Sequence, residues 1–468
     1  MIHLPGISGS TYAVMGLGGS GLAAAEALAA SGAEVRAWDD DAARRRDAET
    51  RGITLHDLAG GGLNAVKALV LSPGIPHTFP APHPIAAHAR DAGIPIICDI
   101  ELLTRAKSEA RFVGVTGTNG KSTVTALIGH IFQTAGRTAA IGGNLGPAAL
   151  ALAELDAEGT YVLELSSYQI ERLETVAFDI AVLINISPDH LDRHGGIEGY
   201  VAAKERLFDL ARTGAIGVIG ADDAHCHAIE GRLHNRGDLT VLPISGSTPV
   251  PGGIWVEGGH VIDGRSVTAG LIADLSGAKA LPGRHNAQNA AAATAVALST
   301  GIRGEDIAEG LATYSGLPHR QETIRRFGAV TYVNDSKATN PDAALSAIAC
   351  YKNVYWIAGG CAREGGLREL ARARGNELGL VRHAFLIGEA APDIAKVLDG
   401  AVPHTRVDNL DAAVAAAHRA AQAAANGDGG GAVVLLSPAC ASFDQFTDFE
   451  DRGMAFRRAV AALGEPQS

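Results

Sequence analysis

A short polar stretch near residue 120 has the composition of a phosphate-binding loop. Residues 116–122 read TGTNGKS and follow an apolar run, residues 111–115, that is predicted to be a strand. A predicted helix, residues 121–134, comes next. A glycine-rich turn at a helix N-terminus presents backbone N–H groups and a partial positive charge, and both bind phosphate. Lys121 is expected to reach the β- and γ-phosphates of ATP, and Ser122 to hold Mg²⁺.

This phosphate loop (residues 116–122) departs from the strict pattern GxxxxGK[ST] at one position, because Val115 stands where the first glycine falls. The shorter GTNGKS form is present in the expected strand, loop and helix context, and it predicts an ATP site. An ordinary glycine turn is the alternative interpretation. The residues assigned to ATP in this segment are Gly117, Thr118, Asn119, Gly120, Lys121, Ser122 and Thr123.

Polar side chains also follow two further apolar runs in the same part of the chain. Glu164 ends the run 161–164, and the pair Asp189 and His190 comes shortly after the run 180–186. Phosphoryl transfer requires a metal ion to neutralise charge, so polar ligands are expected at strand ends beside the phosphate loop. Each acid taken alone could equally be a cap or a surface residue. Lys204, on a predicted helix, has by itself the context of a solvated surface lysine.

A second glycine turn lies close to the N-terminus. Residues 16–21 read GLGGSG, follow a predicted strand (residues 12–16) and fit the pattern GxGxxG. Asp39 ends the next predicted strand, where an acid binds ribose in dinucleotide sites. The pattern indicates a pyrophosphate and a ribose, which a UDP-sugar supplies as well as NAD does. A nicotinamide site and a purely structural turn are the alternatives.

Composition narrows the class of protein. The 468 residues are 47% hydrophobic and 19% charged, with a net charge of -12, which argues against a non-specific nucleic-acid binder. No segment has the apolar length of a membrane span or the order of a signal peptide, so a cytoplasmic protein is expected. Five scattered cysteines without a metal-ligand spacing are interpreted as reduced thiols.

Strand-like and helix-like segments alternate along the whole chain, which predicts an α/β fold with parallel sheets. We predict three domains: a Rossmann-like domain over residues 1–107, a central P-loop ATPase-like domain over residues 108–316, and a second Rossmann-like domain over residues 317–468. Helices are predicted at residues 20–31, 286–299 and 411–425, and strands at 34–38, 354–358, 384–387 and 432–436.

Seven motifs together resemble the Mur ligases. They are GVTGTNGKST (114–123), ELSSYQIE (164–171), NISPDHLDRH (185–194), LPGRHNAQNA (281–290), GLPHR (316–320), NDSKATNP (334–341) and LLSPACASFDQF (435–446). The last two are similar to those of the glutamate-adding member of the family. The resemblance implies an N-terminal domain for the UDP moiety, a central domain for ATP and a C-terminal domain for the incoming amino acid.

The resemblance also implies the reaction and its partners. ATP and Mg²⁺ are expected to drive the joining of D-glutamate to UDP-N-acetylmuramoyl-L-alanine (UDP-MurNAc-L-Ala) through an acyl phosphate, in cytoplasmic synthesis of peptidoglycan precursors. The sequence does not fix the stereochemistry of the glutamate. A monomer that binds neither nucleic acid nor membrane is expected.

Matching the family motifs residue by residue extends the predicted site. Lys121, Lys204 and His190 are assigned to catalysis. The metal set is Ser122, Glu164, His190 and Lys204, the last as a carbamate, which reverses the interpretation of Lys204 as a surface residue. Further nucleotide contacts are Asn286, Asn289 and Arg320. The UDP-substrate set is Gly18, Ser20, Asp39, Gly74 and Asn144. The glutamate set is Lys337, Thr339, Arg363, Ser442 and Phe443.

Arg363 marks a departure from the family pattern, which often has a lysine at this position. An arginine can still bind a carboxylate, and it does so through a planar fork of donors that a lysine lacks. The resemblance therefore predicts a carboxylate-binding group here with an altered geometry.

Overall fold

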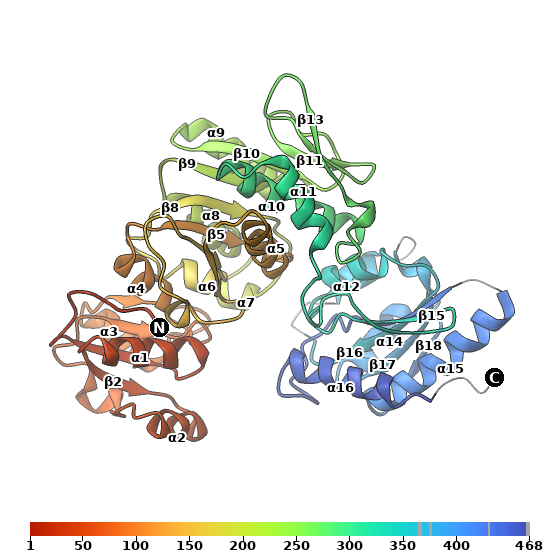
Figure 1. The fold of residues 1–468 in the computed structure, drawn as a ribbon. Coiled ribbons are helices and arrows are strands. Elements are labelled where there is room, and N and C mark those ends of the chain that lie inside the picture. Colours follow the sequence, from red (N-terminus) through yellow and green to blue (C-terminus); the bar gives the residue numbers. More distant parts are fainter. Residues whose placement is uncertain (363–366, 374–376, 429–430, 465–468) are drawn as a thin grey trace. The chain divides into compact units, whose positions relative to one another are not determined.

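The computed structural model describes residues 1–362, 367–373, 377–428 and 431–464. The chain folds into two compact units. The first unit comprises Met1–Gly277 and Ala287–Tyr314, and the second comprises Ala278–Asn286 and Ser315–Ser468. The described residues form three separate sheets, flanked by helices, with mostly parallel strands (Figure 1). The α/β fold class is thereby confirmed, whereas the exact domain boundaries at residues 107/108 and 316/317 stay a prediction.

The first sheet is a four-stranded parallel sheet with the order β2-β1-β3-β4. Alternate residues of β1 enter two apolar clusters on opposite faces: Val14 lies in one, and Ala13 and Met15 in the other. The strands are β1 Thr11–Met15, β2 Glu34–Trp38, β3 Leu69–Leu71 and β4 Ile96–Ile97. The helices are α1 Gly19–Ala30, α2 Ala42–Thr50, α3 Pro84–Asp91 and α4 Asp99–Ala106.

The second sheet of the first unit has nine strands in the order β13-β12-β11-β10-β9-β8-β5-β7-β6. The strands are β5 Arg111–Thr116, β6 Ala139–Gly143, β7 Thr160–Glu164, β8 Phe178–Leu183, β9 Ala211–Gly220, β10 Thr240–Ser245, β11 Ile254–Glu257, β12 His260–Asp263 and β13 Gly270–Asp274. The helices are α5 Lys121–Thr134, α6 Ser167–Ile170, α7 Leu191–His194, α8 Ile197–Asp209, α9 Ala224–Arg236, α10 Gly283–Ser299 and α11 Gly304–Thr313.

Strands β6 to β11 run parallel, and β12 and β13 extend the sheet as antiparallel strands. The helix predicted from Lys121 to Thr134 is confirmed at both ends. A single apolar cluster contains Val70 of the first sheet, Leu103 of α4 and Leu163 of the second sheet. Because burial of apolar surface is the main stabilising term, this shared core explains why the first two sheets form one unit.

The second unit contains a six-stranded sheet with the order β14-β15-β19-β16-β17-β18, in which only β14 is antiparallel. Its strands are β14 Glu322–Phe327, β15 Val330–Asn334, β16 Val354–Gly359, β17 Val381–Ile387, β18 His404–Arg406 and β19 Ala432–Leu436. Its helices are α12 Pro341–Ile348, α13 Arg368–Arg372, α14 Ala391–Leu398, α15 Leu410–Asp428 and α16 Phe449–Ala461. Separate apolar clusters cover the two faces of this sheet, as expected for parallel strands buried on both sides.

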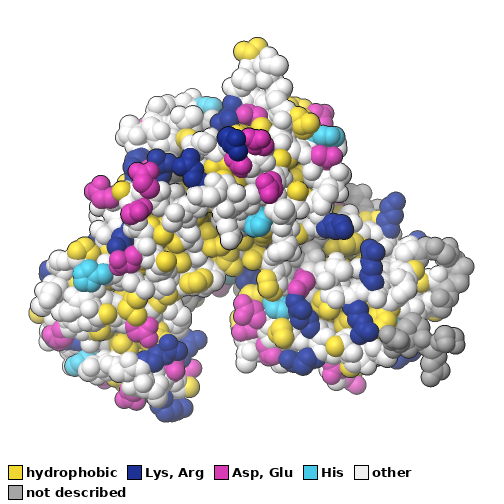
Figure 2. All heavy atoms as spheres, in the orientation of Figure 1, with side chains coloured by type: hydrophobic (Ala, Val, Ile, Leu, Met, Phe, Trp, Pro, Cys, Tyr) yellow, Lys and Arg dark blue, Asp and Glu magenta, His cyan; other side chains and the backbone are white. Residues whose placement is uncertain are grey.

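The surface in Figure 2 shows charged side chains of both signs interspersed with apolar ones. The negative net charge is therefore not visible as one continuous acidic face in that view. Within the described ranges, no helix combines the length and the apolar character that crossing a bilayer requires.

The buried carboxyl group of Asp99 generates a prediction about stability. Asp99 begins α4 and is buried, and burial raises its pKa from 3.8 to about 6. Between these values the folded chain binds more protons at Asp99 than the unfolded chain, so the free energy of unfolding falls as pH rises from about 4 to about 6. We expect Asp99→Asn to remove this loss and to be more stable than the unmutated protein above about pH 6, by roughly 2 kcal/mol.

Urea unfolding of both proteins at about pH 4.5 and about pH 8 measures the difference. Asp91→Asn, at an exposed position on α3, is the control and is expected to have no comparable effect. A stability gain from Asp99→Asn that is equal at both pH values would contradict the prediction.

Candidate active site

Three adjacent strands of the nine-stranded sheet bring the predicted catalytic segments together. Strand β5 lies between β7 and β8, and all three run parallel. The phosphate loop follows β5, Glu164 is the last residue of β7, and His190 lies in the segment after β8. Because parallel strands end at the same edge of a sheet, these groups converge beside the N-terminus of α5.

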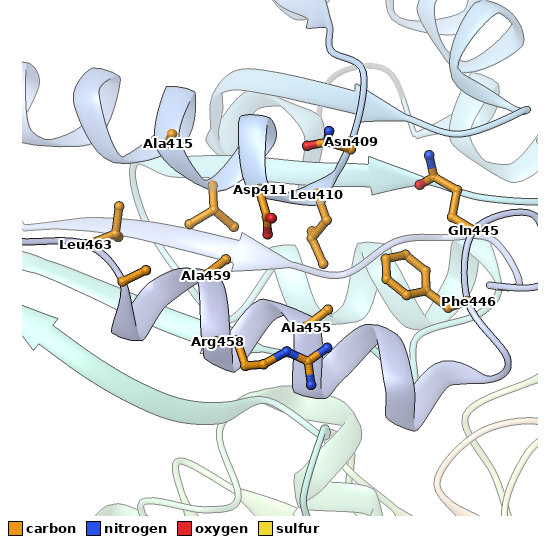
Figure 3. A pocket seen from close by; sticks show the side chains of 12 residues that line it. Asn409, Leu410, Asp411, Ala415, Gln445, Phe446, Ala455, Arg458, Ala459 and Leu463 are labelled. Carbon is orange, nitrogen blue, oxygen red and sulfur yellow. The ribbon is translucent and has the colours of Figure 1, made fainter.

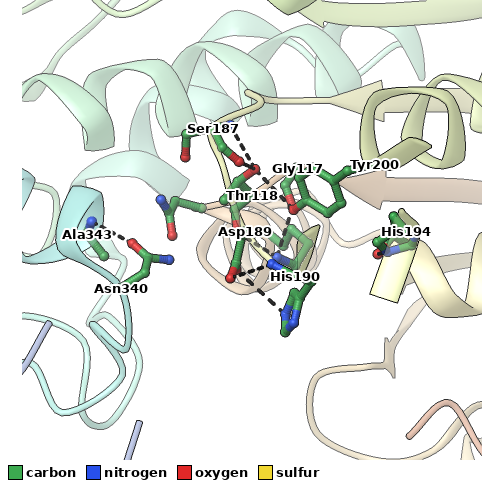
Figure 4. Close-up of polar contacts among 12 residues, drawn as sticks. Gly117, Thr118, Ser187, Asp189, His190, His194, Tyr200, Asn340 and Ala343 are labelled. Carbon is green, nitrogen blue, oxygen red and sulfur yellow. Dashed lines mark hydrogen bonds and ion pairs between the residues drawn. The ribbon is translucent and has the colours of Figure 1, made fainter. Parts of the chain in front are cut away.

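The phosphate loop is held by backbone and side-chain hydrogen bonds to the segment after β8. Thr118 Oγ1 donates to the carbonyl of Ser187 at 3.1 Å and lies 3.1 Å from the hydroxyl of Tyr200 (Figure 4). The N–H of Asn119 donates to Asn185 Oδ1 at 2.9 Å. Lys121 Nζ donates to two carbonyls of the loop itself, at 2.9 and 2.8 Å. The loop is thus a preformed turn with its ammonium group folded over it.

Gly120 is required by the geometry of this loop. Its φ of +87° lies in the left-handed region that favours glycine, and it is the residue before α5. A Cβ atom at this position would lie 2.3 Å from Oδ1 of Asn289. The structure therefore brings the predicted nucleotide residue Asn289, on α10, into contact range of the phosphate loop, although it is more than 160 residues away in the chain.

Glu164 has one carboxylate oxygen available for a cation. It is buried, and its Oε1 accepts a hydrogen bond from Asn144 Nδ2 at 2.7 Å. Among the described residues, Oε2 has no hydrogen-bond partner although it is buried. A buried carboxylate oxygen without a partner is unfavourable unless a cation or a donor satisfies it. The bond to Asn144 also links a predicted metal residue to a predicted substrate residue.

Lys204 is buried beneath the phosphate loop rather than exposed. It lies on α8 with 1% of its surface accessible, and its Nζ donates to the carbonyl of Gly117 at 2.8 Å. Burial, reinforced by the positive charge of Lys121, holds the pKa of Lys204 well below its usual value. The negative charges of Asp189 and Glu164 raise the pKa of Lys204 and partly oppose this effect. The helix prediction is confirmed, and the interpretation of Lys204 as a surface lysine from its local sequence was wrong.

His190 occupies an unusual backbone position at the end of the segment after β8. Its φ of +52° and ψ of +32° are left-handed, a conformation that costs a non-glycine residue about 1 kcal/mol or more. Nε2 lies 3.6 Å from Oδ2 of Asp189 (Figure 4). The imidazole also makes a T-shaped contact with the ring of Tyr168, at 5.3 Å between ring centroids. The side chain is partly exposed at 33%. Its imidazole is therefore partly accessible to solvent at the same sheet edge as Glu164.

The residues predicted for magnesium match the chemistry of a cation site. No group of three or more His, Cys, Asp or Glu side chains in the described ranges is arranged to bind a metal. The predicted set instead combines a hydroxyl, a carboxylate, an imidazole and a lysine that must first become an anion. The unsatisfied oxygen of Glu164 is the one direct indication that a cation fits here.

The N-terminal glycine turn lies at the carboxyl edge of the four-stranded sheet. Strand β1 lies between β2 and β3, so the turn lies between Asp39 and the segment that contains Gly74. Asp39 is buried and its Oδ2 accepts from the N–H of Leu17 at 2.6 Å, so its carboxylate braces the turn. Gly18 has open space where a Cβ would stand, with only Arg44 within 4 Å, and Ser20 is half-buried at the start of α1.

The segments predicted for the amino acid meet at the corresponding edge of the six-stranded sheet. Strand β19 lies between β15 and β16, and the N–H of Ala439 donates to the carbonyl of Ala338 at 3.0 Å. Lys337 lies over the ring of Phe449 at 3.7 Å. The other predicted residues described here are Thr339, the buried Ser442 and Phe443, which is 73% exposed. Arg363 lies outside the described residues.

Two predicted nucleotide residues belong to the second unit by their contacts. Asn286 Nδ2 donates to the carbonyl of Pro282 at 2.8 Å. Arg320 interacts electrostatically with the buried carboxyl group of Asp335. Burial raises the pKa of Asp335 to about 7, and the positive charge of Arg320 partly opposes this rise. Both therefore take part in local interactions within their own unit.

Sequence reasoning missed two buried arginines that contact the predicted site segments. Arg452 on α16 donates to backbone carbonyls of Ser336, Cys440 and Ala441, at 2.9, 3.1 and 3.3 Å. It thereby joins the segments after β15 and β19. Arg172, after α6, donates to carbonyls near Gly74. Neither arginine stands in a spacing that marks it, since the carbonyls bound by Arg172 and the carbonyl of Ser336 bound by Arg452 lie about 100 residues away in the sequence.

A groove of about 720 Å³ lies between α15 and α16 in the second unit (Figure 3). Leu410, Val414 and Phe446 contribute apolar surface, and Asp411 and Arg458 contribute charge. None of the predicted site residues lines it. The groove is therefore separate from the candidate active site.

Comparison with known proteins agrees with this fold. Residues 115–297 match the Mur ligase middle domain. The structure of UDP-N-acetylmuramate-alanine ligase from Thermotoga maritima superimposes with a TM-score of 0.59 at 16% identity, covering 97% of this chain and 99% of that chain. MurF from Acinetobacter baumannii gives a TM-score of 0.58 at 19% identity over 76% and 79% of the two chains. At these identities the likeness establishes a common fold.

Relatives of higher identity establish the family. UDP-N-acetylmuramoylalanine--D-glutamate ligase from Paramagnetospirillum magneticum is 49% identical over 465 residues, 99% of each chain. The enzyme of the same name from Rhodospirillum rubrum is 46% identical over all of this chain and 98% of its own. The chain therefore belongs to the Mur ligase family, in the group of the UDP-N-acetylmuramoylalanine--D-glutamate ligases.

The contact between Gly120 and Asn289 generates a prediction with a matched control. Gly120 and Gly214 both have positive φ, +87° and +79°, but only Gly214 has open space where a Cβ would stand. Substituting alanine at either position is expected to destabilise the fold by about 1 kcal/mol. We expect only Gly120→Ala to displace Asn289 and to lower ligase turnover more than about tenfold. Thermal unfolding and turnover of both variants test this, and equal turnover would contradict it.

Proposed function

We propose that this protein is an ATP-dependent ligase that joins D-glutamate to the L-alanine carboxylate of UDP-MurNAc-L-Ala. The observation that carries the proposal is the convergence of the phosphate loop, Glu164 and buried Lys204 at the ends of neighbouring parallel strands. Full-length relatives that bear the name of this reaction support the choice of substrates. We further infer that the enzyme acts in the cytoplasm as a monomer, without membrane or nucleic acid.

The chemistry explains why ATP is needed. A carboxylate is a poor acylating agent because its leaving group would be an oxide ion. In the proposed first step, a carboxylate oxygen attacks the γ-phosphorus, the bond to the bridging oxygen breaks, and ADP leaves an acyl phosphate behind. The amine of glutamate then attacks the carbonyl carbon and loses a proton, and phosphate leaves with the electrons of the broken C–O bond.

Lys121 and the N-terminus of α5 are proposed to stabilise the charge that develops on the transferred phosphoryl group. Lys121 now donates to the carbonyls of Gly117 and Thr118, and phosphate oxygens would replace these acceptors. Backbone N–H groups of the loop add donors of fixed direction. Asn286, Asn289 and Arg320 are proposed to contact the rest of the nucleotide.

Four side chains are proposed to hold Mg²⁺, namely those of Ser122, Glu164, His190 and Lys204 as its carbamate. When bound, Mg²⁺ would neutralise charge between the phosphates and the incoming carboxylate. Carbamate formation needs an uncharged amine, which attacks CO₂ and releases a proton. The burial that lowers the pKa of Lys204 favours this uncharged form. The modification would turn a buried amine into an anion in the electrostatic environment of Glu164, whose Oε2 is unsatisfied.

The remaining predicted residues are proposed to bind the two substrates that become joined. Gly18, Ser20, Asp39, Gly74 and Asn144 form the proposed UDP-substrate set. Lys337, Thr339, Arg363, Ser442 and Phe443 form the proposed glutamate set. Glutamate carries two carboxylates, so a lysine and an arginine in its set match its charge.

One assay tests the proposed function. The protein is incubated with UDP-MurNAc-L-Ala, ATP, Mg²⁺ and either D- or L-glutamate, and the mass of the product is measured. We expect a product that gains one glutamate residue with D-glutamate, together with stoichiometric ADP and phosphate. ADP release that is independent of glutamate would indicate a kinase or an ATPase and would contradict the proposal, as would a product without added glutamate mass.

The role of Lys204 can be tested by chemical rescue. We expect Lys204→Ala to lose more than about 99% of its turnover, because an anionic group near Glu164 is missing. Short carboxylic acids such as acetate are expected to restore part of it by entering the space of the lost carbamate. Glu205→Ala, at the half-buried neighbour, serves as the control and should show no rescue. A loss of turnover in Lys204→Ala without rescue would contradict the carbamate and leave the ligase assignment intact.

A further inference from the structure

A buried arginine of the nine-stranded part of the chain binds the turn that follows β3. Arg172 is 2% exposed. Its Nη1 donates to the carbonyls of Leu71 and Ser72 at 2.9 and 2.8 Å, and its Nη2 donates to the carbonyl of Ile75 at 2.5 Å. Residues 71–75, here called the substrate turn, include Gly74 of the proposed UDP-substrate set.

A second arginine binds the same turn from a different segment. Arg193 Nη1 donates to the carbonyl of Gly74 at 3.1 Å, and its guanidinium lies over the ring of Tyr168 at 4.5 Å. Arg172 lies eight residues after Glu164, and Arg193 lies three residues after His190. The segments at the ends of β7 and β8 carry two of the proposed metal residues, and each of them also contributes one arginine that binds the substrate turn.

The bonding of Arg172 differs from that of an ordinary ion pair. In the described structure, its hydrogen-bond acceptors are these three carbonyls, and its Nε is buried without a partner. A guanidinium keeps its charge under these conditions, since burial lowers its pKa only to about 10. A buried positive charge thus lies directly beneath the turn. In a chain with a net charge of -12, this places positive charge beside a turn that is proposed to bind the anionic UDP-substrate.

Arg172 connects the substrate turn to the segment that follows Glu164, and this connection bears on how the substrate is placed. The UDP-linked substrate must contact the substrate turn at one end and present its carboxylate to the phosphate loop at the other. Its covalent structure limits its reach, so the separation of these two places decides whether the carboxylate can lie in line with the phosphate. A displacement of about 1 Å can lower the rate about a hundredfold. Arg172 is the buried group that sets the position of the turn relative to the segment of Glu164.

We propose that Arg172 is a positioning residue that holds the substrate turn in register with the phosphoryl-transfer site. This inference rests on the proposed function, because it takes the ligand of the turn to be the UDP-linked substrate. It differs from a purely structural role, in which the arginine would stabilise the fold without affecting one substrate more than the others.

The experiment compares Arg172→Met, Arg172→Lys and Arg193→Met with a control. Arg36→Met is the control because Arg36 Nη1 also donates to two carbonyls of a loop in the same part of the chain, those of Gly62 and Asn64, at 3.2 and 2.9 Å. Steady-state kinetics gives KM for each of the three substrates. Calorimetric titration with UDP-MurNAc-L-Ala alone gives its affinity without turnover, and circular dichroism gives the folded fraction.

We expect Arg172→Met to lower kcat by about tenfold or more, because a displaced turn misaligns the carboxylate. We also expect it to raise KM and Kd for UDP-MurNAc-L-Ala by about tenfold or more, with KM for ATP and for glutamate changed less than about twofold. Arg172→Lys keeps the charge but lacks the planar fork, so an intermediate effect is expected. Arg193→Met removes a hydrogen bond made by a half-buried side chain, so it should raise KM for UDP-MurNAc-L-Ala by a smaller factor. This variant tests the role of the substrate turn even if Arg172→Met does not fold. Arg36→Met should leave all three constants unchanged.

Two results would overturn the inference: an unchanged KM for the UDP-substrate in folded Arg172 and Arg193 variants, or an equal rise for all three substrates. The outcome for the unmutated protein separates this inference from the proposed function. If the unmutated protein forms no glutamate-containing product, the proposed function fails. If it forms the product and the variants show the results named above, only the role of Arg172 fails.

Discussion

Parallel strands end at a common edge of their sheet, and most of the candidate functional segments of this chain depend on that geometry. Strand β5 lies between β7 and β8, so the phosphate loop lies between Glu164 and the segment of His190. The same relation places the N-terminal glycine turn between Asp39 and the substrate turn, because β1 lies between β2 and β3. In each case short turns suffice to bring distant parts of the sequence together, and rigid strands fix where each turn begins.

Burial acts differently on the arginines and on the lysine of these segments, and the difference suits their proposed uses. It lowers the pKa of Arg172 and Arg452 to about 10, so both stay charged and bind carbonyls at neutral pH. It holds the pKa of Lys204 well below its usual value. An arginine is therefore suited to bracing a turn permanently, whereas a buried lysine can become an uncharged nucleophile. Local cations of this kind allow a chain of negative net charge to bind anionic substrates.

The sequence predicted the elements and motifs that depend on local order, and it failed where long-range packing decides. The helix at Lys121–Thr134 and the strand at Glu34–Trp38 were predicted with their exact ends, because apolar runs and glycines mark them. The antiparallel strands β12 and β13 were not predicted, because each has only 4 or 5 residues and glycines stand beside β12 and at the start of β13. Lys204 could not be placed from its local context, because only the fold shows that α8 packs beneath the phosphate loop.

The division of the chain also matches the division of the proposed reaction. Phosphorylation of the carboxylate requires the phosphate loop, the proposed metal residues and the UDP-substrate set, all of which belong to the first unit. The glutamate set belongs to the second unit, so amino-acid selectivity can change there without altering the groups of the first step. Asn286 and Arg320 are the exceptions, because they are assigned to the nucleotide but belong to the second unit.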